Sequence, residues 1–503
     1  MITFNPSFEP LSAQHARALV VFVRQGSPVA LDPSLLTLFP SLEAVVTQEH
    51  FNGAFGRSIA VPILGEQLRY LVLIGIGAPS AEGVIPMEQY RRALGKAIRM
   101  AEQHRWHSIA LQVPQADLFG VSEEYIARQT AETAKIAVYA FDKYITDPER
   151  KSRVTDITLV INGHDKQAFQ EGVTKGRDIA HAVNLARHWI DLPPVALTPA
   201  QMVAEARQIA QDNDLKMTVF TEEQINKMGM GGLAAVAAGS DRDCQFIILE
   251  YSSGIKSAQT LGFVGKGITF DSGGLSIKPA ESMETMKDDM AGSAAVLAAM
   301  EVLAKLKPQV NIVGFMPMTE NLPSGKATKP GDIITFYNGK TAEVKNTDAE
   351  GRLILADALS YAEKHYKLDA IVDLATLTGS CAAALGPHFS GLMTQHEGMA
   401  ERLTEYAARS GDAVWRLPMP DDYRVAIKSP VADLANIGSS RYKAGAITAG
   451  LFLSNFIEKT PWAHLDIAGS AFNVPDISYY RSEGATGVGV RLLVEMAMNW
   501  KSL

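Results

Sequence analysis

The chain has 503 residues, of which 47% are hydrophobic and 20% are charged, and its formal net charge is −8. The length exceeds what one hydrophobic core usually holds, so we expect at least two domains, and the composition excludes a disordered or fibrous protein. The acidic balance argues against a general affinity for nucleic acid or for anionic membrane surfaces. With only two cysteines, Cys244 and Cys381, and no uninterrupted apolar run of membrane-spanning length, we expect a cytoplasmic protein without a disulfide framework.

Residues 1–162 alternate apolar runs with amphipathic stretches, a pattern typical of an α/β domain. Gly75 and Gly77 follow one of the apolar runs, but the third glycine of a dinucleotide-binding fingerprint is missing. We interpret the two glycines as an ordinary tight turn between a strand and a helix, and we assign no cofactor there. In this domain we predict strands at 18–23, 70–74 and 109–113 and a helix at 87–104.

A long helix is predicted from Asp165 to Ile190, because apolar residues recur there with the helical period. Pro193 and Pro194 end it, since proline removes a backbone donor and clashes with the preceding turn. We expect residues 163–192 to connect the smaller N-terminal α/β domain to a second domain.

The second domain, residues 193–503, is predicted to hold a central, mostly parallel sheet flanked by helices. It begins with a helix at 199–213, for which Thr198 is the expected N-cap and Pro199 the first helical residue. Several of its strand-like runs are apolar throughout, which is typical of strands covered on both faces. The predicted strands are 217–220, 245–250, 261–265, 310–314 and 370–374.

Two polar clusters occupy places where a strand gives way to a helix, the edge of a doubly wound sheet at which ligands bind. The first, residues 264–290, includes Lys266, Asp271, Lys278, Asp288 and Asp289. The second, residues 346–353, reads Asn-Thr-Asp-Ala-Glu-Gly-Arg-Leu and includes Asp348, Glu350 and Arg352. Taken alone, the second cluster is equally well explained as the start of a helix, where Asn, Thr and acidic residues are favoured.

The run at 346–353 resembles the signature of the leucyl aminopeptidase (cytosol aminopeptidase) family, dinuclear metallopeptidases that remove N-terminal residues. The resemblance extends to the cluster at 264–290 and to the motifs at 184–194, 375–379 and 464–469, although Val195 stands where the family commonly has Asn. It implies that the metal ligands are Lys266, Asp271, Asp289, Asp348 and Glu350, and that the catalytic cations are Lys278 and Arg352.

The implied chemistry is hydrolysis of peptides with a free N-terminus, mainly after Leu and other apolar residues. Carboxylate oxygens suit Mn²⁺ or Mg²⁺ and tolerate Zn²⁺, and four carboxylates need two divalent ions to balance their charge. We expect Lys278 to polarise the scissile carbonyl, and the family resemblance implies that Arg352 holds a bicarbonate acting as general base. Met286 and the loop 376–379 resemble parts of the pocket for the N-terminal side chain. The family also forms homohexamers.

Three other interpretations bear on the function. A phosphate-binding nucleotide enzyme built on Lys266 is disfavoured because the P-loop spacing is absent. A DNA-binding regulator that keeps a peptidase fold is not indicated by the composition, yet retained metal ligands do not argue against it. His464 and Asp466 could form a catalytic pair, but their apolar neighbours favour a structural role.

Overall fold

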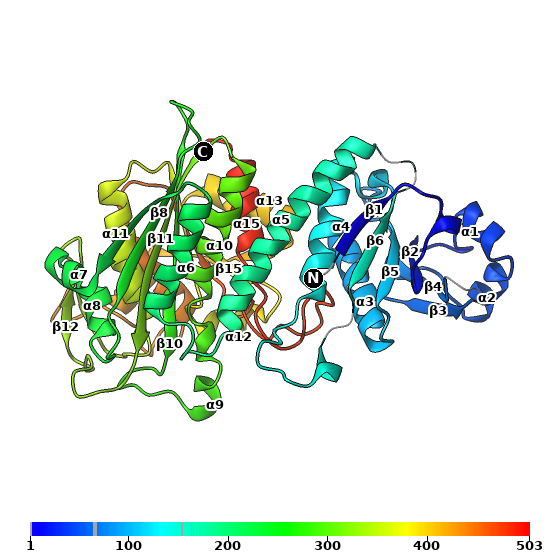
Figure 1. The fold of residues 1–503 in the computed structure, drawn as a ribbon. Coiled ribbons are helices and arrows are strands. Elements are labelled where there is room, and N and C mark those ends of the chain that lie inside the picture. The colour runs from blue at the N-terminus through cyan, green and yellow to red at the C-terminus, as the bar shows by residue number, and fades with distance from the viewer. Residues whose placement is uncertain (1–2, 64–67, 152–153, 162, 164) are drawn as a thin grey trace. The chain divides into compact units, whose positions relative to one another are not determined.

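The computed structural model describes residues 3–503 except 64–67, 152–153, 162 and 164. The chain divides into two compact units. Unit 1 comprises Met1–His181 and Pro475–Ser482, and unit 2 comprises Ala182–Val474 and Glu483–Leu503. The division therefore falls inside helix α5 (Lys166–Asp191), the helix that the sequence predicts at 165–190. The expected α/β fold with two domains is confirmed (Figure 1).

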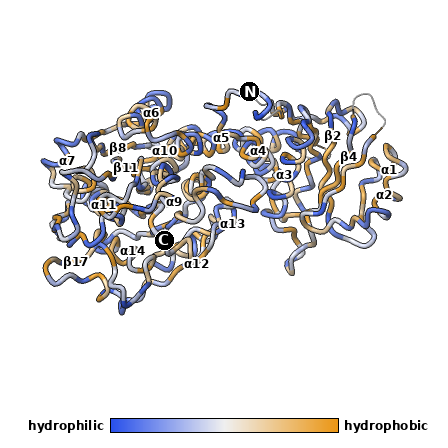
Figure 2. Tube along the Cα trace, turned by 90° about the horizontal axis from the view of Figure 1, so that it is seen from below, coloured by the Kyte–Doolittle hydropathy of each residue, from blue (hydrophilic) through white to orange (hydrophobic). Residues whose placement is uncertain are grey.

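Unit 1 is built on a six-stranded sheet with the order β1-β6-β5-β2-β4-β3. Neighbouring strands are parallel except β3, which runs antiparallel to β4. Figure 2 shows hydrophobic residues concentrated along β2 and β4, whose side chains are almost all buried. The strands are β1 (Thr3–Ser7), β2 (Ala18–Arg24), β3 (Ser58–Pro62), β4 (Tyr70–Gly77), β5 (Ser108–Gln112) and β6 (Asp156–Val160), and the helices are α1 (Pro33–Leu38), α2 (Leu42–Gln48), α3 (Met87–Gln103) and α4 (Glu123–Val138).

The interpretation of Gly75 and Gly77 as a strand-to-helix turn is wrong, because both residues belong to strand β4. A side chain at Gly75 would place its Cβ 2.1 Å from the carbonyl oxygen of Ala54. Gly77 has a φ of 83°, which favours glycine. Gly75 thus lets the chain at residue 54 approach the strand closely.

Unit 2 contains a nine-stranded sheet with the order β16-β15-β18-β14-β9-β11-β8-β7, and β10 pairs with β11. Strands β18, β14, β9 and β11 are parallel, whereas β7 and β8 pair in antiparallel fashion with their neighbours. Strand β15 is antiparallel to β18 and parallel to β16. The five predicted strands are all present, and β11 extends well beyond the predicted end at 314. The strands are β7 (Lys216–Thr221), β8 (Gln245–Tyr251), β9 (Thr260–Gly265), β10 (Gly267–Asp271), β11 (Asn311–Asn321), β14 (Ala370–Ala375), β15 (Ser390–Met393), β16 (Val414–Arg416) and β18 (Trp462–Asp466).

Helices cover this sheet on both sides. On one side, α10 packs on β9 and β11. It also contacts α6 and α15, and α13 packs on α15. On the other side, α11 packs on β9 and β11 and contacts α8 and α14. None of the helices in the described parts of the chain is long and apolar enough to cross a membrane. The helices are α6 (Pro199–Asp212), α7 (Glu222–Met228), α8 (Gly231–Ala237), α9 (Ala280–Met283), α10 (Ala291–Leu306), α11 (Gly351–His365), α12 (Gly379–Leu385), α13 (Glu397–Ser410), α14 (Gly445–Leu453) and α15 (Val490–Met498), and a small sheet joins β12 (Ile333–Thr335), β13 (Thr341–Glu343) and β17 (Leu434–Ala435).

The register of the parallel strands brings their carboxyl ends to one level. Gly265 of β9 lies opposite Leu374 of β14, and Ala375 of β14 lies opposite Asp466 of β18. The residues that follow β9 and β14, Lys266 and Thr376, are therefore neighbours at one edge of the sheet. This is the edge at which α/β proteins bind ligands.

Candidate metal centre and active-site cavity

Short connections at this edge of the sheet in unit 2 carry all seven predicted site residues. Lys266 follows β9, Asp271 ends β10, and Lys278 lies in the loop after it. Asp289 follows the 3₁₀ turn η4 (Met286–Asp288) and precedes α10. The turn before α11 holds Asp348 and Glu350, and the first turn of α11 holds Arg352. All seven line one cavity of about 810 Å³.

Asp271, Asp348 and Glu350 form the acidic centre of the cavity, with one carboxylate oxygen from each lying within 4.8 Å of the others. The turn before α11 thus contributes two carboxylates, as the sequence pattern predicts, and Glu350 also serves as the N-cap residue of α11. Helix start and acidic site are not alternatives here, because the same short turn provides both. Asp289 stands outside this group of three and joins it through Lys266.

Lys266 bridges Asp289 and Glu350. Its Nζ lies 2.7 Å from Asp289 Oδ1 and 2.8 Å from Glu350 Oε1, and it donates to the carbonyl oxygen of Thr376 at 2.8 Å. Burial alone would lower the pKa of Lys266, but the negative charges of Asp289, Glu350 and Asp271 outweigh it and raise the pKa. The ammonium group compensates the charge of the carboxylates around it.

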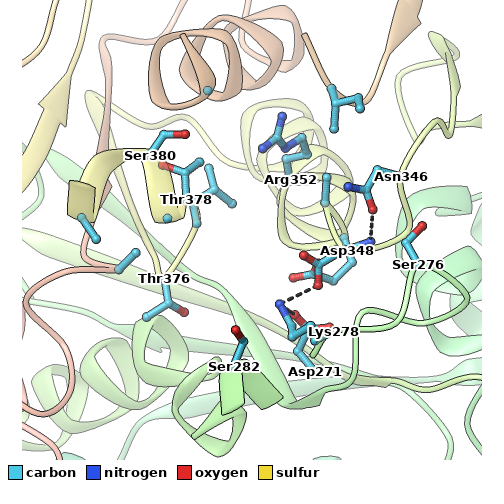
Figure 3. A pocket seen from close by; sticks show the side chains of 18 of the residues that line it. Asp271, Ser276, Lys278, Ser282, Asn346, Asp348, Arg352, Thr376, Thr378 and Ser380 are labelled. Atoms are coloured by element: carbon cyan, nitrogen blue, oxygen red, sulfur yellow. Dashed lines mark hydrogen bonds and ion pairs between the residues drawn. The ribbon is translucent and has the colours of Figure 1, made fainter. Parts of the chain in front are cut away.

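Lys278 approaches the same centre from the opposite loop. Its Nζ lies 2.8 Å from Asp271 Oδ2 and 2.5 Å from Asp348 Oδ1 (Figure 3). Burial favours the neutral amine, but the two carboxylates overcome this and raise the pKa of Lys278 above its usual value. The two carboxylates therefore favour the ammonium form of Lys278, the form that a carbonyl-polarising role requires.

Arg352 is buried, with 6% of its surface exposed. Its Nη1 donates to the carbonyl oxygen of Asn436 at 2.7 Å, and its Nε has no hydrogen-bond partner among the described residues. Burial lowers the pKa of Arg352 to about 10, so the guanidinium remains charged near neutral pH. In Figure 3 Lys278 and Arg352 lie on either side of Asp348, so a cation stands on each side of the acidic centre.

The donor set fits divalent metal ions. Asp289 Oδ2 and Glu350 Oε2 are buried oxygens without a hydrogen-bond partner in the described structure, an arrangement that is costly unless a cation binds them. Burial also raises the pKa of Asp271 and, more strongly, of Asp289. Oxygen-rich ligands of this kind suit hard ions such as Mn²⁺ and Mg²⁺, and Zn²⁺ accepts them as well.

Residues that the sequence did not single out hold the ligands in place. Asn321, at the end of β11, donates to Asp271 Oδ1 at 2.8 Å and to the carbonyl oxygen of Thr347 at 3.0 Å. Asn436 accepts from the backbone of Lys345 at 2.8 Å and donates to the carbonyl oxygen of Asn346 at 2.6 Å. Nothing in the local sequence marks either asparagine, because each becomes a neighbour of the site only through the tertiary fold.

Gly273 and Gly274 follow Asp271 and have φ values of 85° and 63°, in the left-handed region. A Cβ at Gly273 would lie 2.5 Å from the carbonyl oxygen of Ser276 and 2.9 Å from Asp348 Oδ1. The chain therefore makes a tight turn beside the carboxylates, and this turn brings the loop with Lys278 close to the acidic centre.

Met286 and the loop 376–379 also line the cavity, which is consistent with the predicted pocket for a substrate side chain. His464 and Asp466 are fully buried behind it. His464 Nδ1 pairs with Asp373 Oδ1 at 2.6 Å, and Asp466 Oδ2 accepts from the hydroxyl of Thr378 at 2.6 Å. These contacts give both residues a structural task, as their apolar neighbours in the sequence indicate.

Known proteins share both the sequence pattern and this architecture. A model of the catalytic domain of the cytosol aminopeptidase family matches residues 184–494, and a model of the N-terminal domain of the same family matches residues 20–148. A probable cytosol aminopeptidase from Synechococcus sp. (strain JA-3-3Ab) is 42% identical over 471 residues, covering 92% of this chain and 90% of the relative. One from Alkaliphilus metalliredigens (strain QYMF) is 40% identical over 462 residues, covering 91% and 90%.

Two solved structures are similar along nearly their whole length. A mutant of tomato leucine aminopeptidase has a TM-score of 0.87 and 30% sequence identity, with 99% of this chain and 97% of that chain covered. The bottromycin maturation enzyme BotP in complex with Mn has a TM-score of 0.84 and 31% identity, with coverage of 96% and 99%. Together with the family models and the identities of about 40%, these similarities show that the chain belongs to the cytosol aminopeptidase family.

Proposed function

We propose that this metal-dependent aminopeptidase releases leucine and other, mostly apolar, N-terminal residues from peptides with the help of two divalent ions, Mn²⁺ or Zn²⁺, per subunit. The observation that carries the proposal is the convergence of Asp271, Asp348 and Glu350 within 4.8 Å, with Lys278 on two of them, inside one cavity. In this arrangement Lys266, Asp271, Asp289, Asp348 and Glu350 would hold the ions.

Two bound ions would supply a water of lowered pKa and an electrophile for the scissile carbonyl. Lys266 would act as a ligand through its neutral amine, because nearby divalent ions disfavour the ammonium form. The two buried oxygens without partners, on Asp289 and Glu350, are the atoms that most need such a cation.

The protein's own cations complete the site. Lys278 lies at the cavity surface as a charged donor, placed to stabilise the oxygen of a tetrahedral intermediate. Arg352 is a planar donor suited to a bidentate anion, and we propose that it binds the bicarbonate that takes up the proton of the attacking water. Met286 and Leu377 line the cavity with apolar surface and would contact the N-terminal side chain.

Metal analysis combined with kinetics on leucyl p-nitroanilide tests the proposal. The chelator-stripped protein should be inactive, and Mn²⁺ should restore hydrolysis with two ions bound per chain. Lys278→Ala and Arg352→Ala should each lower kcat by about 100-fold while two ions stay bound, whereas Asp348→Ala should lose metal too.

Lys326→Ala, which removes an exposed lysine outside the cavity lining, serves as the control and should leave both the metal content and kcat unchanged. Full activity in a verified metal-free preparation would overturn the proposed mechanism. Loss of metal from Lys278→Ala would contradict the role given to that lysine.

A further inference from the structure

Five carboxylates line the cavity, and the proposed metal centre uses four of them. The fifth is Asp288, the last residue of turn η4 and the neighbour of Asp289. Only 8% of its surface is exposed. Its backbone N–H donates to the carbonyl oxygen of Thr285 at 3.0 Å, which fixes the main chain.

The carboxylate of Asp288 receives no hydrogen bond or ion pair from any other residue in the described parts of the chain. Lys266, Lys278 and Lys287 act on it electrostatically, yet none of these cations forms an ion pair with it. Burying a carboxylate without a partner costs free energy, and such groups are retained mainly where a ligand satisfies them. The cavity that this carboxylate lines is the place from which a partner can come.

The surroundings of Asp288 describe the partner. Met286, two residues earlier in the same turn, and Leu377, in the loop after β14, are apolar and line the same cavity, whereas Asp288 supplies a negative charge. A side chain with an apolar stem and a cationic head matches such a wall, because the stem packs on Met286 while the head pairs with the carboxylate. Lysine and arginine are the residues with this shape.

We propose that Asp288 determines specificity by pairing with the cationic head of an N-terminal Lys or Arg, so that the enzyme cleaves basic as well as apolar N-terminal residues. This inference rests on the proposed peptidase function of the same cavity. A competing role, in which Asp288 binds the α-ammonium group, would act on every substrate alike. The contrast between a basic and an apolar side chain therefore separates the two roles.

The test compares lysyl and norleucyl p-nitroanilides, whose side chains share the aliphatic stem and differ in the ammonium group. The measured quantity is the ratio of kcat/KM for the lysyl to the norleucyl substrate, at pH 8.5 and with metal content verified for each protein. Asp288→Asn, which keeps the shape and removes the charge, should lower this ratio about tenfold or more. Asp288→Glu retains the charge, so its ratio should stay closer to that of the native enzyme than the ratio of Asp288→Asn does.

Glu284→Gln is the matched control, because it removes one negative charge from an exposed position four residues earlier and should leave the ratio unchanged. An equal loss on both substrates in Asp288→Asn, or an unchanged ratio, would overturn the specificity role. So would a native enzyme that cleaves the norleucyl substrate and not the lysyl one. A native enzyme that cleaves neither substrate would instead refute the proposed function.

Discussion

Gly351 shows how closely the proposed metal ligands are packed. It is the first residue of α11, and a Cβ at this position would lie 2.5 Å from Cε of Lys266. Lys266 cannot withdraw, since its side chain is 3% exposed and its Nζ is held by three oxygens. The absence of a side chain at residue 351 thus decides where the amine of Lys266 lies.

We predict that Gly351→Ala weakens the affinity for Mn²⁺ at least tenfold and thereby lowers the metal content of the protein. The free energy of unfolding of the metal-free protein should fall by about 1–3 kcal/mol as well, because the added Cβ overlaps the buried side chain of Lys266 and strains its ion pairs. Gly325→Ala, where nothing lies within 4 Å of the added Cβ, is the control. Metal titration followed by mass spectrometry checks the effect, and unaltered Mn²⁺ binding in Gly351→Ala would contradict it.

His464 provides a pH-dependent contribution to stability. Burial favours the neutral imidazole, but Asp373, 2.6 Å away, outweighs this effect and raises the pKa of His464 above its ordinary value of 6.5. The folded state therefore holds this proton more tightly than the unfolded chain does. Its contribution is fully present below about pH 6.5 and is lost as the pH rises through the folded-state pKa.

His464→Gln removes this contribution, so the stability difference between the native protein and the variant should shrink as the pH rises above 6.5. Urea unfolding of the metal-free proteins between pH 5.5 and 8.5 measures it. His15→Gln, at an exposed position, should run parallel to the native protein over the whole range. A constant difference for His464→Gln would show that the histidine is neutral in the fold.

At the scale of elements, the loop between β14 and α12 depends on Asp466 at the end of β18. Asp466 Oδ1 accepts from the backbone N–H of Leu377 at 3.2 Å, and Oδ2 accepts from the hydroxyl of Thr378 at 2.6 Å. The same loop presents Thr376, whose hydroxyl donates to Asp289 Oδ1 at 2.8 Å. One buried carboxylate thus holds the loop that contacts the metal centre.

Asp466→Ala should lower the free energy of unfolding by about 2–4 kcal/mol, because it leaves buried donors unpaired. It should also weaken Mn²⁺ binding, since Thr376 loses its fixed position. Asp466→Asn keeps one acceptor oxygen, so it should lose less stability and less Mn²⁺ affinity than Asp466→Ala. Unfolding curves and metal titrations of the two variants and the native protein, all at one pH, check these effects. An alanine variant as stable as the native protein would contradict the prediction.

At the scale of the whole molecule, metal binding should stabilise the fold. The five proposed ligands come from the connection after β9, the end of β10 and the turns before α10 and α11, so ions would tie together elements that are distant in the sequence. Removal of the ions with a chelator should therefore lower the Tm, and added Mn²⁺ should raise it again in a concentration-dependent way. An identical Tm for the stripped and the Mn²⁺-loaded protein would argue against these ligands.

Assembly is the second property at this scale. Because the sequence resembles a family that forms homohexamers, we propose that this chain also assembles as a homohexamer. Light scattering coupled to size-exclusion chromatography should give a mass of about six chains, each of 54.4 kDa. An active monomer at assay concentration would contradict this proposal.

Several central strands and long helices can be predicted from the sequence alone. Mostly apolar runs such as 245–250 and 370–374 mark β8 and β14, because strands covered on both faces are built mainly from apolar residues. Thr198 and Pro199 mark the start of α6 through local capping chemistry, and Thr198 does accept from the backbone N–H of Gln201. The charged residues at 264–290 and 346–353 predicted polar connections between strands and helices, the family resemblance supplied the proposed ligand set, and the seven residues line one cavity.

Which of these groups come into contact depends on the tertiary fold. Strand register sets Lys266 beside Thr376 at a separation of 110 residues, and it brings Asn321 and Asn436 to the ligands without any local signal. The position of Gly75 within β4 rather than in a turn also depends on a distant backbone segment. The packing of the chain also places Asp288 near lysines and apolar side chains without an ion pair to any of these lysines. Sequence patterns report local backbone preference and burial, whereas contacts between distant residues arise only when the strands pair and the helices pack.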